Sequence, residues 1–178
     1  MTKFDASRRT FGTVVQANLD DAYALAMRLC RNGADAEDIV QEAAMRALRA
    51  LETEDVAHPK AWFLTIVRNC AYTFLERSRA SPVAAVGDVH DLADQGEIGA
   101  WASRDDAEVA IIAAQDGEQV RKAIDALPIA MREALVMREI NELSYKEIAQ
   151  AQGVPMGTVM SRLARARDLL ADMLRGLR

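Results

Sequence analysis

Cysteine, histidine and aromatic residues are scarce in this chain. Two cysteines and two histidines occur among its 178 residues, and aromatic side chains make up 5% of the sequence. Cys30 and Cys70 form neither a disulfide framework nor a metal-ligand motif, and His58 and His90 have no partner at ligand spacing. A Walker loop and a nucleophile elbow are also missing. We therefore expect no metal site, no cofactor and no enzymatic activity.

Long apolar runs and strand patterns are missing as well. No stretch approaches the roughly 20 apolar residues of a membrane span, and no apolar run follows the basic start of the chain, as a signal peptide would require. We expect a cytoplasmic protein without direct membrane insertion. The sequence shows no alternation typical of strands, and it is rich in Ala, Leu, Met, Glu and Arg, which favour helices. This composition predicts an all-α fold.

The acidic charge is distributed unevenly along the chain, whose net charge is -5. Residues 1–80 carry eleven basic and eleven acidic side chains, whereas residues 81–115 carry one and seven. The remainder carries ten and nine. DNA binding requires a local basic face rather than a basic protein, so the overall charge does not exclude it.

A segment rich in acid and glycine separates two helical regions. Residues 81–107 contain Pro82 and three glycines and lack sustained helical periodicity, which predicts a flexible acidic linker. It joins two small helical domains, 10–80 and 108–178. In the first domain, the 3.6-residue period predicts helices over 19–30, over 35–51 with Asp35 as N-cap, and from Pro59. In the second, it predicts helices over 109–127, 128–140, 144–153 and 155–174.

The segment from Ser144 to Leu170 has the pattern of a helix-turn-helix. Such a motif needs a small residue where its helices cross, a turn residue that tolerates positive φ, and an apolar residue that anchors the second helix. Ala149, Gly153 and Val159 stand at these places. The second helix is then free to enter a major groove. An ordinary helical hairpin with a solvated arginine face is the alternative. The expected DNA contacts are Thr158, Ser161, Arg162, Arg165 and Arg167.

The helix-turn-helix resembles the last region of extracytoplasmic-function (ECF) sigma factors. The stretch SYKEIAQAQGVPMGTVMSRLARAR, residues 144–167, carries this resemblance. It implies that the second helix reads the promoter's −35 element. Arg162, near the helix N-terminus, is expected to read a base edge, and Arg165 to contact phosphate. Met160 stands where members often carry lysine, which removes one expected phosphate contact.

The segment DAEDIVQEAAMRALRAL, residues 35–51, resembles the helix with which this family docks on core RNA polymerase. The resemblance implies contact with a coiled coil of the polymerase's largest subunit. The three- and four-residue spacing of Asp38, Gln41, Glu42 and Met45 places them on one face. A solvated amphipathic helix is the alternative. The implied polymerase-binding residues are Asp35, Asp38, Gln41, Glu42 and Met45.

Residues 58–79 resemble the family's helix that melts and captures the −10 element. Trp62 lies on the apolar stripe and is expected in the core. The family builds a pocket for an unpaired base largely from the loop before this helix, here residues 52–58, which are unusually acidic. The implied −10 contacts are Lys60, Arg68, Asn69 and Arg77.

The resemblance covers almost the whole chain and implies an ECF-type sigma factor that directs promoter-specific transcription initiation. Its expected partners are bacterial core RNA polymerase, promoter DNA and an anti-sigma factor. Two alternatives remain at this point. One is a helix-turn-helix regulator that acts without polymerase. The other is a sigma-like decoy that sequesters an anti-sigma factor.

Overall fold

The computed structural model describes residues 11–51, 53, 56–80 and 117–175. These residues form helices, turns and connecting loops and contain no strand, which confirms the all-α prediction. The expected linker, 81–107, lies outside the described residues, as does the predicted start of the helix over 109–127. The described part of that helix covers 117–126.

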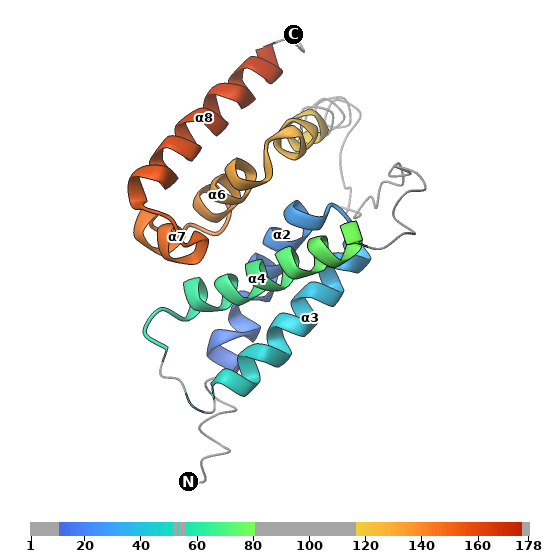
Figure 1. The fold of residues 1–178 in the computed structure, drawn as a ribbon, viewed down its shortest axis with the longest axis vertical. Coiled ribbons are helices and arrows are strands. Elements are labelled where there is room, and N and C mark those ends of the chain that lie inside the picture. The colour runs from blue at the N-terminus through green and yellow to red at the C-terminus, as the bar shows by residue number, and fades with distance from the viewer. Residues whose placement is uncertain (1–10, 52, 54–55, 81–116, 176–178) are drawn as a thin grey trace, which may run out of the picture.

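The N-terminal domain is a bundle of three long helices (Figure 1). A 3₁₀ turn, η1 (Gln16–Asn18), leads into α2 (Leu19–Cys30), which is followed by α3 (Gly33–Ala50) and α4 (Pro59–Ala80). All three helices pack against one another. Leu25 of α2, Ala43 of α3 and Phe63 of α4 are inaccessible to solvent. The helices at 19–30 and from Pro59 begin where the sequence predicted.

The N-terminus of α3 differs from the prediction. Asn32, not Asp35, is the N-cap, and its side chain accepts a hydrogen bond from the Asp35 backbone N–H at 3.0 Å. Asp35 therefore lies in the first turn, where its carboxylate still interacts favourably with the helix dipole. Asn and Asp cap helices about equally well, so the residue types alone did not identify the cap.

The C-terminal domain contains the predicted helix-turn-helix. It consists of α6 (Ile129–Glu139), α7 (Tyr145–Gln152) and α8 (Met156–Arg175) in addition to the helical segment 117–126. Ser144 and Glu147 form a reciprocal capping box at the start of α7. Gly153 ends α7 with a φ of 64°, the left-handed conformation that the turn requires. Val159 of α8 is buried, as predicted for the anchoring residue.

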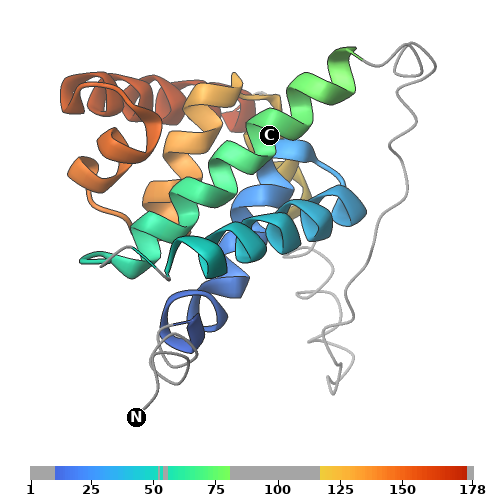
Figure 2. The ribbon, with the colours of Figure 1, turned by 60° about the horizontal axis from the view of Figure 1, so that its bottom comes forward.

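The two domains pack directly against each other. Helix α6 lies between α8 and the N-terminal bundle, where it contacts α2, while α4 contacts α7 (Figures 1 and 2). Six consecutive residues of α6, 132–137, are buried. Six consecutive residues cover the whole circumference of a helix, so α6 is surrounded by other parts of the protein. Helix α6 is therefore both the core helix of its own domain and the main contact with the other domain.

Candidate polymerase and DNA interfaces

The outer face of α3 presents the predicted polymerase-binding side chains to solvent. Asp38, Gln41 and Glu42 are exposed, and Met45 is 46% exposed. Within this group, Glu42 accepts a hydrogen bond from the Arg46 Nε at 2.7 Å. Asp35 stands apart at the helix start and is only partly exposed. Four of the five predicted side chains thus form one surface, with two carboxylates, an amide and an exposed thioether.

The predicted −35 contacts on α8 divide into three groups. Thr158, Ser161 and Arg165 lie on the side opposite the buried Val159, and Ser161 and Arg165 are exposed. The Ser161 hydroxyl donates to the Thr158 carbonyl at 2.9 Å. Because the 3.6-residue period brings these three residues together, they form an open sector.

Arg162 and Arg167 point elsewhere. Arg162 is half-buried and donates from Nη1 to Oε1 of the buried Gln152 at 2.8 Å. Arg167 pairs with Glu139 at 2.7 Å, on the side of α8 that faces α6. The structure therefore does not bring all five predicted side chains into one sector.

The predicted −10 contacts on α4 are partly engaged by other side chains. The Lys60 Nζ lies 2.8 Å from the Asp21 carboxylate of α2. Arg68 forms an ion pair with Glu133 of α6. Asn69 and Arg77 are exposed. Of these four side chains, the C-terminal domain therefore covers Arg68 and leaves Asn69 and Arg77 exposed.

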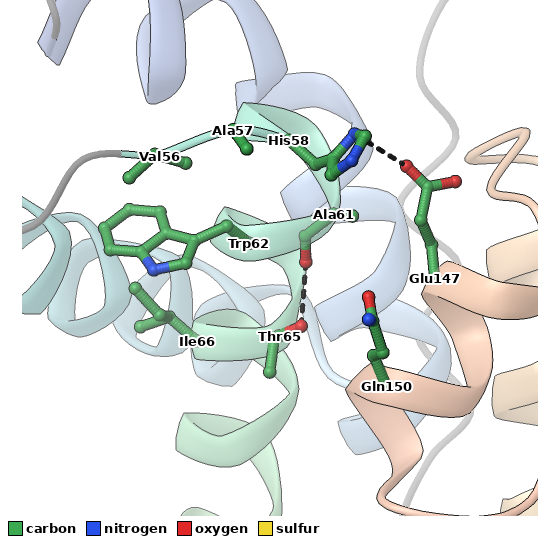
Figure 3. Close-up of a pocket in the computed structure, with 9 residues that line it drawn as sticks. All are labelled: Val56, Ala57, His58, Ala61, Trp62, Thr65, Ile66, Glu147 and Gln150. Carbon is green, nitrogen blue, oxygen red and sulfur yellow. Dashed lines mark hydrogen bonds and ion pairs between the residues drawn. The ribbon is translucent and has the colours of Figure 1, made fainter.

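A pocket lies at the junction between the N-terminus of α4 and helix α7 (Figure 3). Its volume is about 480 Å³. The Trp62 ring lies between Val56 and Ile66 on one side, and Glu147 and Gln150 of α7 stand opposite (Figure 3). Trp62 packs against the core, as predicted, but it also lines this pocket. The pocket is thus lined on one side by α4 and the loop before it, and on the other side by α7.

His58 and Glu147 bridge the rim of this pocket. The His58 Nδ1 lies 3.8 Å from the Glu147 carboxylate. The Ser144 hydroxyl, which hydrogen-bonds Glu147, lowers the pKa of that carboxyl group, and the Ser144 backbone N–H acts in the same direction. Glu147 is consequently ionised at neutral pH and provides a negative charge beside the α4 N-terminus.

Sequence reasoning did not identify Tyr72 and Glu133. The Tyr72 hydroxyl donates to Glu133 at 2.8 Å, and the Arg68 guanidinium lies over the Tyr72 ring, 4.4 Å from its centroid. Burial raises the pKa of Tyr72 to about 12, and the Glu133 charge acts in the same direction. The available signal was Arg132 and Glu133 side by side within the apolar run of α6, which indicates charges with partners in another element.

Other kinds of site find little support in the described part of the chain. Within those ranges, no group of three or more His, Cys, Asp or Glu residues could hold a metal ion. None of the described helices combines the length and apolarity needed to cross a membrane. Cys30 and Cys70 are free thiols, and burial raises the pKa of both. Raised pKa values disfavour the reactive thiolate form.

Both domains match known sequence families. The model for Sigma-70 region 2 matches residues 14–81, and the model for Sigma-70, region 4 matches residues 117–170. The ECF RNA polymerase sigma factor SigE of Mycolicibacterium smegmatis is 30% identical over 95% of this chain, which spans 63% of that relative. The ECF RNA polymerase sigma-E factor of Escherichia coli K12 is 32% identical over 80% of this chain and 75% of the relative.

Two solved structures are similar over both domains. The sigma factor RpoE from Bartonella quintana, co-crystallised with the anti-sigma factor NepR, superposes with a TM-score of 0.71 and 25% identity, covering 94% of this chain and 99% of RpoE. CnrH, in complex with the cytosolic domain of CnrY, has the same fold, with a TM-score of 0.64 at 21% identity over 98% of this chain and 95% of CnrH.

The matched regions define a two-domain protein of the sigma-70 type, with region 2 in the N-terminal bundle and region 4 around the helix-turn-helix. The chain belongs to the ECF RNA polymerase sigma factors. These findings confirm the family that the sequence motifs indicated.

Proposed function

We propose that this chain directs promoter-specific initiation by docking on core polymerase through α3, capturing the −10 element with α4 and reading the −35 element with α8. The exposed α3 surface is the main observation that supports the proposal. Asp38, Glu42 and Met45 are grouped on the outer side of a helix whose inner side is buried. This surface suits a basic helical partner. The two carboxylates attract its positive charges, and the flexible methionine side chain can pack against its apolar side chains.

The α8 surface supports a role in duplex recognition. Arg165 stands in the open sector with Thr158 and Ser161, and an arginine in this position can reach a guanine edge or a phosphate. The left-handed Gly153 sets the angle at which α8 leaves α7. A recognition helix placed by such a turn enters a major groove with its N-terminal residues leading.

The α4 surface and its pocket support capture of unpaired DNA. Strand opening requires a surface that binds single strands, and such surfaces combine aromatic side chains with cations. Helix α4 offers Trp62 and Tyr72 together with Arg68 and Arg77. The pocket beside Trp62 lies where the family resemblance places an unpaired base.

Control by an anti-sigma factor is part of the proposal. RpoE, which this chain resembles over both domains, was captured with its anti-sigma factor. A protein of the cytoplasm without enzymatic activity is expected, because the polymerase performs the chemistry and the sigma subunit supplies recognition.

The decisive experiment is run-off transcription with purified core polymerase on a library of promoter sequences. The proposal predicts transcripts from a small set of templates that share −35 and −10 elements, and none without the chain. A helix-turn-helix regulator would instead shift an operator fragment without polymerase and give no chain-dependent transcript. A decoy would bind an anti-sigma factor and fail to transcribe from every template. Either result would overturn the proposal.

A further inference from the structure

An acidic side chain of the C-terminal domain occupies a cationic, aromatic site on α4. The Glu133 carboxylate accepts from Arg68 through one oxygen and from the Tyr72 hydroxyl, at 2.8 Å, through the other. The Arg68 guanidinium also stacks on the Tyr72 ring. Arg68 and Tyr72 stand one helical turn apart, so α4 presents them together. This pair is called the Arg68–Tyr72 site below.

The Arg68–Tyr72 site has the chemistry of a nucleotide site. A guanidinium binds a phosphate oxygen as it binds a carboxylate, and a tyrosine ring stacks on any base. In the described arrangement a carboxylate is held where a phosphate would be. The Glu133 side chain is only 1% exposed, so nothing from solvent can compete while the domains are packed together.

Helix α7 covers a second part of the same α4 surface. The ionised Glu147 carboxylate lies beside His58, and Gln150 lines the pocket on the side opposite Trp62 (Figure 3). Helices α6 and α7 therefore both place polar side chains against α4.

The promoter requires the two domains to be apart. Elements centred at −35 and −10 are separated by about 25 base pairs, or about 85 Å at 3.4 Å per base pair. Helices α4 and α7 are in contact, so the described arrangement cannot place α4 and α8 on both elements at once. The 36 residues between Ala80 and Gly117 span at most about 120 Å when extended, which is sufficient.

We infer that the Arg68–Tyr72 site binds the sugar–phosphate and an unpaired base of single-stranded DNA, and that Glu133 occupies it as an internal competitor until the domains separate. This inference rests on the proposed function for the identity of the strand. Before separation Glu133 neutralises Arg68 and immobilises Tyr72, and afterwards both side chains are available to DNA.

The test measures binding of a fluorescein-labelled, mixed-sequence 12-nucleotide single strand to the full-length chain by fluorescence anisotropy. Glu133→Gln removes the charge, and Glu133→Lys repels Arg68. We expect Glu133→Lys to bind the probe about tenfold more tightly than the wild type, and Glu133→Gln about threefold. Glu118→Gln and Glu118→Lys make the same charge changes on an exposed residue whose ion pairs lie within its own segment, and they should stay within twofold.

A second substitution tests whether the tighter probe binding of Glu133→Lys depends on the Arg68–Tyr72 site. Tyr72→Phe keeps the stacking ring and should preserve the gain of Glu133→Lys, whereas Tyr72→Ala should abolish it. Circular dichroism checks the fold; if Glu133→Lys loses helicity, Glu133→Gln alone decides. Probe binding no tighter than in the Glu118 controls would overturn the inference, as would a gain that survives Tyr72→Ala.

Failure of this inference and failure of the proposed function can be distinguished, because the probe is bound without polymerase. Failure of the proposed function appears as missing run-off transcripts. Failure of this inference appears as unchanged single-strand binding in a chain that still transcribes.

Discussion

The surfaces of α4 and α8 that we assign to DNA binding both carry arginine, but they differ in what covers them. The Arg68 side chain on α4 is 19% exposed and is paired with a buried carboxylate of the other domain. Arg165 on α8 is exposed, beside the exposed Ser161. The surface assigned to duplex recognition is therefore open in the isolated chain, whereas the surface assigned to the melted strand is closed.

The domain interface that closes α4 includes several polar contacts. Arg132 donates to the Arg28 carbonyl at 2.8 Å, and the Asn141 amide donates to the Asp21 carbonyl at 3.1 Å. Arg28 and Asp125 form an ion pair at 3.4 Å. Buried polar groups need partners, which water supplies equally well once the surfaces separate. The interface also has an apolar part, because buried apolar residues of both domains belong to one continuous hydrophobic cluster.

The largest effect is expected on the open α8 surface. Arg162 is held by Gln152 while Arg165 is not, so we expect Arg165, rather than Arg162, to make the larger contribution to base reading. Arg165→Ala should cost about 1–3 kcal/mol at the correct promoter and relax preference at one −35 position. Arg162→Ala should lose less binding free energy at the same promoter.

Transcription across all single-base variants of the −35 element measures both effects. Arg175→Ala, on an exposed arginine at the end of the same helix, is the matched control and should behave as wild type. A uniform loss for Arg165→Ala, with no position relaxed, would reduce this residue to a phosphate contact. A larger loss of specificity for Arg162→Ala would reverse the assignment.

The next effect concerns the outer surface of α3, which is exposed to solvent. Asp38→Arg combined with Glu42→Arg reverses its charge while the buried side of α3 stays unchanged. Core polymerase affinity should fall about tenfold, or about 1.4 kcal/mol, with the circular dichroism spectrum preserved. The control combines Glu118→Arg with Asp172→Arg on exposed acids of the other domain. Undiminished binding by the α3 variant would remove α3 from the polymerase interface.

The turn that orients α8 offers an effect on stability rather than on binding. No atom lies within 4 Å of a Cβ added at Gly153 or at Gly157, but only Gly153 has positive φ. Gly153→Ala should therefore lower the free energy of unfolding by about 1–2 kcal/mol through backbone strain alone. Gly157→Ala, inside α8, should raise it by about 0.5–1 kcal/mol. Urea denaturation distinguishes them, and equal effects would contradict the assigned turn geometry.

The smallest effect is expected at the cysteines. Burial raises the pKa of Cys30 and Cys70, so near neutral pH each stays protonated and reacts slowly with iodoacetamide. Reactivity should increase only as the pH rises above the ordinary thiol range, and in urea both should react at the rate of a free cysteine. Rapid modification of either native thiol at pH 7 would contradict this and indicate a redox-sensitive site.

The helices and the turn were predictable because their signals are local. Ser144 and Glu147 are three residues apart, and Gly153 marks the end of α7 through its own backbone. The covered α4 surface was not predictable, because Arg68 and Glu133 are 65 residues apart and no periodicity links them. The different environments of Arg162 and Arg165 on α8 depend on Gln152, which binds Arg162. Gln152 is a polar side chain whose burial the sequence pattern does not show.

Energy transfer between the two domains tests the central claim most directly. One dye is attached at Glu76→Cys on α4 and the other at Ala164→Cys on α8, both exposed positions, in a chain whose two native cysteines are alanine. We predict high transfer in the free chain and its loss on a promoter with core polymerase, where the domains stand about 85 Å apart. Low transfer in the free chain, or transfer unchanged on the promoter complex, would contradict the closed arrangement.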